Sequence, residues 1–390
     1  MEVLSYEAYT VGIVCALEFE MSAVRYMLDK EHARLPRQLG DSTLYILGEL
    51  SGHNVILASL PGSQGKSAGA AVAKDMARTF PSIELRLMVG IGGGVPSVKN
   101  DIRLGDVVVS MPDGQHGGVV QYDLGKSTDD GIVLKGFLWP PSEILRSAVS
   151  IMRSDHRISQ SKIPEFISAL FQKTDELRLS YQRPVEPDEL FQPEYRHISH
   201  QATCQLCDKT KLVHRQPRKP IPKIHYGLIA SGDQVIRSAS NTAEVNRRVG
   251  GDILCFEMEA AGIATEYSCI TIRGVSDYAD SHKNDAWQYH AAATAAGCAK
   301  ELLSYVDLPQ PSTTTEALSR HRSDLFTDSG LAAQSIFRGR GPFHKFFEQL
   351  LVDNIVFQND DVDWRHSAIN NQPAKRCTWR VRQPGFRFTD

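Results

Sequence analysis

The chain has 390 residues, of which 42% are hydrophobic and 8% aromatic, so it holds enough apolar material for a large core. It carries 43 Lys and Arg against 46 Asp and Glu, and this near balance argues against a dedicated nucleic-acid or polybasic membrane binder. No apolar run approaches the ~20 residues needed to span a bilayer, and residues 1–10 lack the basic-then-apolar order of a signal peptide. We therefore expect a soluble cytoplasmic protein.

Short β-branched runs alternate with helical patterns in both halves of the chain, which is typical of β-α-β architecture. In the first half, apolar runs predict strands at 10–17, 54–60, 85–94 and 105–110, and amphipathic patterns predict helices at 18–29 and 66–79. In the second half the predicted strands are 224–231, 253–256 and 269–277, and the predicted helices are 257–267 and 287–305. The alternation predicts an α/β fold.

Residues 125–223 differ in composition from both halves, because they are rich in proline and charged residues. Their pattern predicts a single helix, around 142–153. A structureless loop of this length is uncommon inside a compact domain, so we expect a long, partly ordered insertion. The main domain then covers 8–306. It is followed by a linker at 307–330 and a tail of unknown role at 331–390, which holds one short apolar helix candidate at 343–357.

Two glycine-rich segments come close to nucleotide-binding motifs without matching them. The first ends in GKS, but a phosphate-binding loop needs glycine at the position of Leu60. The second follows a strand, but the dinucleotide motif needs glycine at the position of Val95, so a nicotinamide cofactor is not supported. Both segments are either plain tight turns or places where backbone N–H groups approach a ligand closely, at Gly65, Gly92 and Gly93.

Seven segments carry a family resemblance because they occur together in one order, at 12–20, 61–71, 89–95, 101–110, 227–236, 255–262 and 273–280. Over roughly 8–124 and 223–306 they resemble the nucleoside phosphorylase and nucleosidase superfamily. Within it they are similar to the fungal branch often found as the N-terminal module of large immune-type receptors. The resemblance implies a three-layer α/β/α domain on a mixed, partly closed central sheet. It also implies cleavage of the N-glycosidic bond between a purine and ribose, without a cofactor.

Breaking such a bond needs stabilisation of an oxocarbenium-like sugar, a proton for the departing base and a nucleophile below the ring. Asp277 follows an apolar strand, and burial at a strand end favours the protonated form of a carboxyl group. The resemblance assigns the aspartate of the Ser276-Asp277 pair to N7 of the purine. Two alternatives stay open, namely that Asp277 caps the next turn or that Asp280 is the acid.

Glu259 and Met258 lie where a predicted strand gives way to a helix. A carboxylate there can accept hydrogen bonds from both the 2′ and 3′ hydroxyls of ribose and stabilise the developing positive charge. The resemblance assigns Glu259 to these hydroxyls and Met258 to packing on the sugar. Glu259 could instead be an ordinary exposed helix residue, and Glu257 is expected to stabilise the helix N-terminus.

Glu20 bears on whether the attacking group is water or phosphate. Hydrolysis needs a carboxylate that orients and deprotonates water, whereas phosphorolysis needs cationic and hydroxyl groups. The resemblance places a nucleosidase glutamate eight residues after the glycine of the first strand, and the spacing from Gly12 to Glu20 matches. By the same resemblance, the position at which phosphorylases present a serine to phosphate corresponds to Ala68, with Ser67 beside it. Hydrolysis is therefore favoured, and the alternative functions are phosphorolysis and a non-catalytic nucleotide sensor or receptor remnant. Glu20 could also be a plain surface residue of its helix.

Residues 231–236 suggest the base pocket, because they resemble a nucleosidase segment whose backbone atoms contact the edge of the purine. Val235 and Ile236 correspond to the last two positions, and Asp233 is a lesser candidate. Val235 replaces the aromatic residue that stacks on the base in those enzymes, so stacking must come from elsewhere.

Relatives in the fungal and bacterial defence branch are associated with removing adenine from ATP. We therefore expect ATP or a related adenine nucleotide as the substrate, with other purine nucleosides as alternatives. A triphosphate needs several cationic donors near its 5′ end. The basic side chains in or beside the motif segments are Lys66, Arg103, Arg237, His282 and Lys283, each of which could also be a solvated surface charge.

The seven cysteines are odd in number and lie mostly in apolar runs, which favours reduced thiols over disulfides. Cys204 and Cys207, with His200 and His214 nearby, have zinc-like local spacing, but no second ligand pair follows at a regular distance. An uncoordinated loop is the favoured interpretation, and no metal is expected in the chemistry. The resemblance also implies a homodimer or a larger homo-oligomer.

Overall fold

The computed structural model describes residues 4–129, 131–198, 201 and 203–308. The chain divides into two units, Met1–Pro309 and Gln310–Asp390, and every described residue belongs to the first. The predicted tail and its helix candidate, most of the predicted linker, and His200 lie outside the described residues. None of the described helices is both long and apolar enough to cross a membrane.

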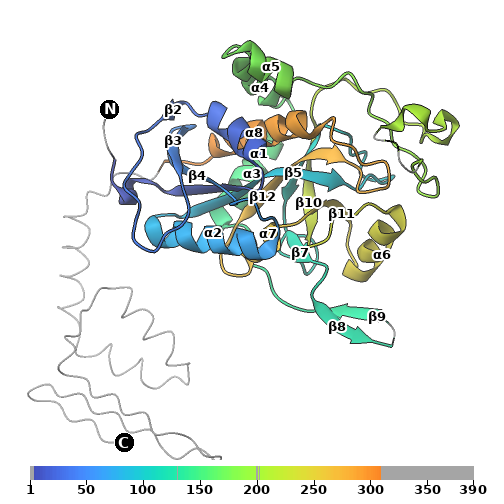
Figure 1. Cartoon of the computed structure of the whole chain (residues 1–390), viewed down its shortest axis with the longest axis horizontal. Coiled ribbons are helices and arrows are strands. Elements are labelled where there is room, and N and C mark those ends of the chain that lie inside the picture. The colour runs from blue at the N-terminus through green and yellow to red at the C-terminus, as the bar shows by residue number, and fades with distance from the viewer. Residues whose placement is uncertain (1–3, 130, 199–200, 202, 309–390) are drawn as a thin grey trace, which may run out of the picture. The chain divides into compact units, whose positions relative to one another are not determined.

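A mixed ten-stranded sheet forms the centre of the described unit, in the order β11-β10-β6-β12-β5-β1-β4-β3-β2 with β7 beside β10 (Figure 1). Its strands are β1 Val11–Cys15, β2 Lys30–Glu31, β3 Ile46–Leu50, β4 His53–Ser59, β5 Leu85–Gly94, β6 Val107–Ser110, β7 Val119–Gln121, β10 Ile224–Ser231, β11 Ile253–Glu257 and β12 Ile270–Asp277. A separate hairpin comprises β8 Gly125–Thr128 and β9 Gly131–Leu134.

The sheet closes on itself because the far end of β5 also pairs with β11, with Gly94 opposite Cys255 and Gly93 opposite Phe256. A Cβ atom at Gly92 would lie 2.5 Å from the Sγ of Cys255 and 2.8 Å from the carbonyl oxygen of Phe256. Glycine is therefore needed where the two strands meet. This closure confirms the predicted mixed, partly closed sheet, and it gives the glycine run a structural role that the sequence motif did not reveal.

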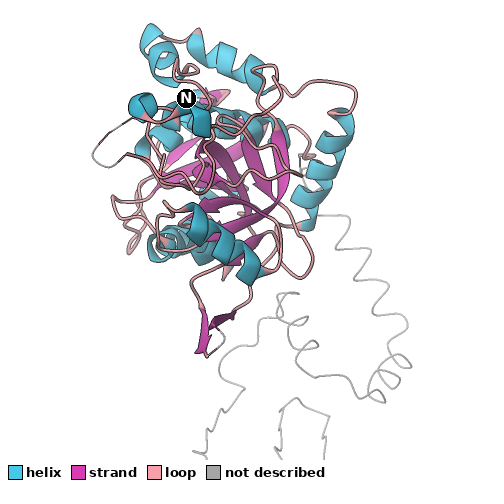
Figure 2. Ribbon diagram, turned by 90° about the vertical axis from the view of Figure 1, so that its right-hand side faces the viewer, coloured by secondary structure: helices cyan, strands magenta, loops and turns pink. Residues whose placement is uncertain are grey.

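Helices cover both faces of the sheet, which makes three layers (Figure 2). The helices are α1 Glu18–Tyr26, α2 Lys66–Thr79, α3 Glu143–Asp155, α4 Ile163–Phe171, α5 Asp175–Tyr181, α6 Ala239–Val249, α7 Ala260–Ala264 and α8 Gln288–Leu303. Three short 3-10 helices are η1 Tyr6–Ala8, η2 Cys204–Leu206 and η3 Lys209–Lys211. In β1, Ile13 packs with the layer of α1, α3, α4 and α8, and Val14 packs with the layer of α2 and α7.

The insertion at 125–223, predicted to be partly ordered, contains three helices that pack on α8. Leu145 and Val149 of α3 and Ile163 of α4 are fully buried in the same core cluster as the alanines of α8. The helix predicted around 142–153 is confirmed as α3. Because α8 lies between the sheet and these helices, it is apolar almost all round rather than amphipathic.

Candidate active site

A cavity of about 250 Å³ opens where four strands of the closed sheet end, namely β1, β5, β11 and β12. Its wall includes the predicted acids Glu20, Glu259 and Asp277, and also Met258, Val235, Ile236, Gly92 and Gly93. Two larger hollows, of about 780 and 760 Å³, are lined by other parts of the chain and contain none of the predicted site residues. The 250 Å³ cavity is therefore the candidate site.

Glu20 is turned into the cavity at the start of α1 and is only 2% exposed. Its Oε2 accepts hydrogen bonds from the backbone N–H groups of Ala16 and Leu17, both at 2.8 Å, and its Oε1 accepts one from Ile91 at 2.7 Å. Burial raises the pKa of Glu20, while the charge of Arg273 and these three N–H groups oppose the rise. The three N–H donors therefore hold the carboxyl group in one orientation.

Arg273 is a buried cation in the middle of the apolar strand β12 and is 1% exposed. Its Nη2 contacts the carboxylates of Glu257 and Glu259, the latter at 3.2 Å, and its Nη1 lies 4.0 Å from Glu20. The three carboxylates raise the pKa of Arg273 despite its burial. One guanidinium therefore holds together carboxylates from α1, β11 and the start of α7.

The sequence motifs predict no role in the site for Arg273. The signal was nevertheless present, since an arginine inside the apolar run 269–275 is buried and a buried arginine must be paired. Glu257 has the role expected for it, because its carboxylate accepts hydrogen bonds from the N–H groups of Glu259 at 3.1 Å and Ala260 at 3.0 Å at the start of α7.

Glu259 is only 4% exposed, so it is not the exposed helix residue of the alternative interpretation. Opposing effects act on the pKa of its carboxyl group. Burial raises its pKa to about 7; Arg273 opposes this, and the nearby Glu257 and Glu20 add to it. Its Oε1 accepts a hydrogen bond from the N–H of Gly65 at 3.2 Å. Gly65 has a φ of 101°, a conformation that favours glycine.

Asp277 lies at the end of β12, where three donors surround its carboxylate. Oδ2 accepts a hydrogen bond from the Oγ of Ser276 at 2.9 Å and lies 3.1 Å from the Nζ of Lys283, and Oδ1 accepts one from the N–H of Ala279 at 2.9 Å. The contact with Ala279 means that Asp277 also caps the following turn. Asp280, the alternative acid, is not among the residues that line the cavity.

Four predicted substrate-binding residues do not line the cavity, namely Gly65, Lys66, Asp233 and Arg103. The Nζ of Lys66 lies 2.6 Å from Asp123 and 3.3 Å from Asp233, so this lysine and Asp233 join the start of α2 to the loop after β10. Arg103 pairs with Asp101 at 2.7 Å and lines a separate hollow of about 40 Å³. Local ion pairs therefore engage both cations, a feature that spacing along the chain did not reveal.

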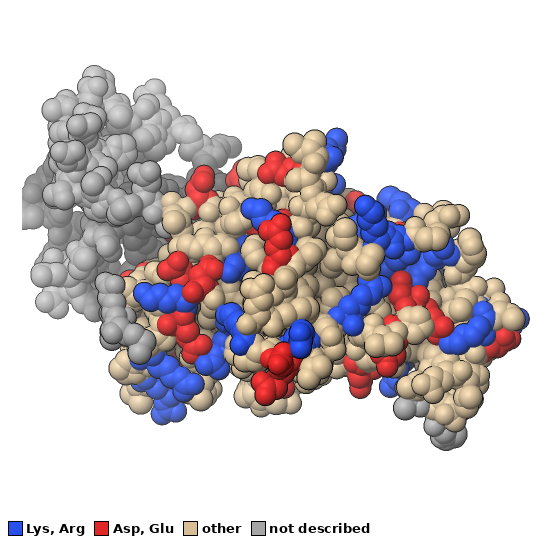
Figure 3. Space-filling model, turned by 90° about the horizontal axis from the view of Figure 1, so that it is seen from above, with Lys and Arg blue, Asp and Glu red and all other residues tan. Residues whose placement is uncertain are grey.

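Two of the remaining basic candidates lie by the cavity. Lys283 lines it, and the Nη2 of Arg237 donates a hydrogen bond to the carbonyl oxygen of Lys283 at 3.2 Å. His282 is buried away from the cavity, stacked on Phe191 with 4.2 Å between the ring centroids. On the face seen in Figure 3, basic and acidic side chains are interspersed, so this face carries no broad basic surface.

A family model described as the phosphorylase superfamily matches residues 10–304. The chain belongs to this superfamily. The match covers both halves of the closed sheet together with the insertion between them.

Similar proteins agree with this membership. A nucleotide-binding leucine-rich repeat (NLR)-like protein of Hyaloscypha variabilis is 38% identical over 321 residues, which are 82% of this chain and 31% of that protein. The chain thus spans about a third of that relative. A 5′-methylthioadenosine/S-adenosylhomocysteine nucleosidase of Mycobacterium tuberculosis is 25% identical over 302 residues, which are 76% of this chain and 96% of the nucleosidase.

Among solved structures, futalosine hydrolase of Helicobacter pylori has a TM-score of 0.50 at 19% identity, covering 77% of this chain and 99% of that one. This likeness shows a shared fold.

Proposed function

We propose that this protein hydrolyses the N-glycosidic bond of a purine nucleoside or nucleotide. The observation that carries the proposal is that Glu20, Glu259 and Asp277, which are far apart in the sequence, line one cavity. Glu20 orients a water molecule and takes its proton as the water oxygen attacks C1′. Glu259 accepts hydrogen bonds from the 2′ and 3′ hydroxyls. As the bond from C1′ to N9 breaks, its electron pair leaves with the purine and Asp277 donates a proton to N7.

The charge around Arg273 favours water over phosphate as the nucleophile. Three carboxylates, those of Glu20, Glu257 and Glu259, face this one guanidinium within 4.0 Å. A phosphate dianion entering this cluster meets an excess of negative charge, whereas a water molecule does not.

For the substrate we propose ATP or a related adenine nucleotide. A cavity of about 250 Å³ is close to the lower end of ligand-site volumes and suits a nucleoside, so the phosphates of a nucleotide would lie at its mouth. The Lys283 side chain, 25% exposed, and the exposed Arg237 lie there as phosphate donors. Phe256 lines the cavity and is the candidate for base stacking in place of the aromatic that Val235 lacks.

Two smaller proposals accompany this function. The first is a cytoplasmic location, because the six described cysteines are free thiols and the cytoplasm is reducing. We also propose that the protein forms a homodimer or a larger homo-oligomer in which a neighbouring copy completes the cavity mouth. Val235, which lines the cavity yet is 52% exposed, lies where such a copy would add apolar contact.

Product analysis tests the proposed reaction. The full chain is incubated with ATP, adenosine or inosine, with and without inorganic phosphate, and the sugar product is identified by mass spectrometry. Adenine release that leaves an unphosphorylated C1′ hydroxyl, without added phosphate, supports hydrolysis. Strict phosphate dependence with a sugar 1-phosphate product would make the protein a phosphorylase. If wild type and Asp277→Asn are equally silent on a broad purine panel, the alternative of a non-catalytic sensor is favoured.

A further inference from the structure

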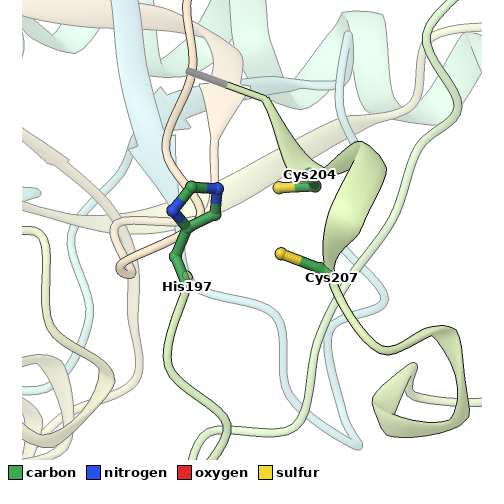
Figure 4. Close-up of side chains that lie close together, drawn as sticks. All are labelled: His197, Cys204 and Cys207. Atoms are coloured by element: carbon green, nitrogen blue, oxygen red, sulfur yellow. The ribbon is translucent and has the colours of Figure 1, made fainter. Parts of the chain in front are cut away.

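The insertion brings together three metal-ligating side chains that the proposed reaction does not use. They are His197, Cys204 and Cys207, whose ligand atoms all lie within 4.8 Å of one another. Figure 4 shows the two sulfur atoms and the imidazole ring facing a common space, with the cysteines on the η2 turn and the histidine on the preceding loop. We propose that these three side chains bind a zinc ion.

The η2 turn, Cys204–Leu206, explains why both sulfur atoms face the same way. The N–H of Cys207 donates a hydrogen bond to the carbonyl oxygen of Cys204 at 3.2 Å, which closes one tight turn between the two cysteines. A C-x-x-C pair on such a turn has the spacing typical of a zinc-binding half-site. His197, seven residues before Cys204, supplies the third donor that the sequence spacing alone did not identify.

The chemistry of the donor set selects the ion. Two thiolates and one imidazole are soft and borderline ligands, and in a tetrahedral arrangement they suit zinc rather than magnesium or calcium, which prefer oxygen. Binding requires both thiols to lose their protons to solvent while the neutral imidazole coordinates through a ring nitrogen. Three protein donors leave a fourth position for water or for another side chain.

A buried histidine beside the cluster, outside the group of ligand atoms within 4.8 Å of one another, is the candidate for that fourth position after a rotation of its side chain. His282 is 7% exposed, and neither of its ring nitrogens has a hydrogen-bond partner, although Nδ1 lies 3.6 Å from a carboxylate oxygen of Asp280. Its ring centroid is 5.5 Å from that of His197, and its carbonyl oxygen is 3.8 Å from the Sγ of Cys204. An unpartnered buried imidazole at this place is a second, independent indication of a ligand.

The position of the cluster suggests what the ion would do. It joins the insertion to the loop that follows β12, because the N–H of His197 donates a hydrogen bond to the Oγ of Ser281 at 3.0 Å. The same loop carries Lys283, and it begins directly after Asp277. We therefore assign the ion a structural role that fixes the loop beside the candidate active site. It has no part in the bond-breaking steps.

Metal analysis of the full chain tests the site. The protein is purified from zinc-supplemented medium under reducing conditions, and its metal content is measured by inductively coupled plasma mass spectrometry. We expect one zinc per chain in the wild type, and its loss in Cys204→Ser and Cys207→Ser. His197→Asn should weaken binding by at least the roughly 10–100-fold that the loss of an outer-shell partner costs. His214→Asn is the matched control, since His214 is exposed nearby and is not in the cluster.

Cobalt substitution keeps the proposal testable if a cysteine variant fails to fold. Zinc is removed from the wild type with a chelator and replaced by Co²⁺, whose thiolate charge-transfer and tetrahedral ligand-field bands report the donor set. Bands of a thiolate-containing tetrahedral site support the proposal, and their change in His282→Asn would identify the fourth ligand. Wild-type protein that holds no zinc and gives no such bands, or whose Cys204 and Cys207 are joined in a disulfide under the same reducing conditions, would overturn it.

Discussion

The cavity wall and the insertion segment 182–223 hold their polar side chains in different ways. In the wall, strand ends supply backbone N–H groups and one arginine to acidic side chains, as the three N–H donors to Glu20 show. In the segment, the contacts are made between side chains. Phe191 stacks on His282 of the loop after β12, and Arg215 pairs with Asp188 at 3.0 Å. The wall therefore takes its geometry from the sheet, whereas the segment depends on contacts that a single substitution can remove.

This difference separates two kinds of sensitivity. Residues of the wall should control the reaction directly, and residues of the segment should act on it through the loop after β12. Variants in the two regions therefore test whether they are functionally distinct.

The largest effect is expected in the wall, at Asp277. Replacing it with Asn removes the proton donor to the base, and positioned proton transfer contributes about 10²–10⁴-fold in rate. The rate of adenine release in single-turnover experiments should fall by that factor, while circular dichroism should show that the variant is folded like the wild type. The matched control is Asp280→Asn, three residues away and outside the cavity lining, which should retain most activity. Equal losses in both variants would contradict the assignment of Asp277.

Arg273→Met should cause the largest loss of stability. It leaves the carboxylates of Glu20, Glu257 and Glu259 buried without their cation, and removing one partner of a buried ion pair costs roughly 3–5 kcal/mol. Chemical denaturation of the full chain measures the free energy of unfolding. Arg247→Met breaks an exposed pair with Glu244 and serves as the control, with a change of no more than about 1 kcal/mol. Comparable changes in both variants would refute the importance of the buried cluster.

In the insertion segment, Arg215→Met should have an intermediate effect. Arg215 pairs with Asp188 and donates a hydrogen bond to the hydroxyl of Tyr278 at 2.9 Å, so its loss leaves two part-buried groups without this partner. We expect a free-energy loss of about 1–3 kcal/mol by denaturation, and a smaller reduction in turnover than in Asp277→Asn. A turnover loss as large as that of Asp277→Asn would mean that the two regions are not functionally distinct.

Lys283→Met tests whether the cavity mouth recognises phosphate. If the ammonium group contacts the phosphates, the substitution should raise the KM for ATP by about tenfold, which is the loss of one charge-assisted hydrogen bond, and leave the KM for adenosine nearly unchanged. Steady-state kinetics with both substrates give the ratio. Lys126→Met, at an exposed residue of β8 outside the cavity lining, is the control. Equal effects on ATP and adenosine would remove the phosphate-binding role.

Glu259 should give the protein a pH dependence of stability. Burial raises its pKa from 4.5 to about 7, so between these values the unfolded chain has lost this proton while the folded chain keeps it. The contribution is fully present below about pH 4.5 and is lost as the pH rises towards 7. Relative to Glu259→Gln, which stays neutral, the wild type should therefore lose stability over this range in denaturation experiments. A difference that does not vary with pH would contradict the raised pKa.

Local patterns predicted much of the architecture, but not every helix. The bounds expected for α2, β5 and β10 are those found, because long apolar or amphipathic runs decide the local structure by themselves. The proline-rich composition of 125–223 predicts no helix at Ile163–Phe171, yet α4 forms there because a proline in the first turn of a helix is favourable. The helix α6 was missed because only Val245 and Val249 of its residues are buried, which is too weak a pattern to detect.

Local sequence patterns are enough to predict the α/β alternation, the family resemblance and the three acidic residues proposed for the reaction. Contacts between distant segments determine that β5 meets β11 to close the sheet, that Arg273 holds the carboxylates together, and that Lys66 and Arg103 pair with acids outside the cavity lining. The difference lies in how far apart along the chain the interacting residues are. Periodicity and turn chemistry act between residues close along the chain, whereas the partners of a buried charge are set by which strands the fold brings side by side.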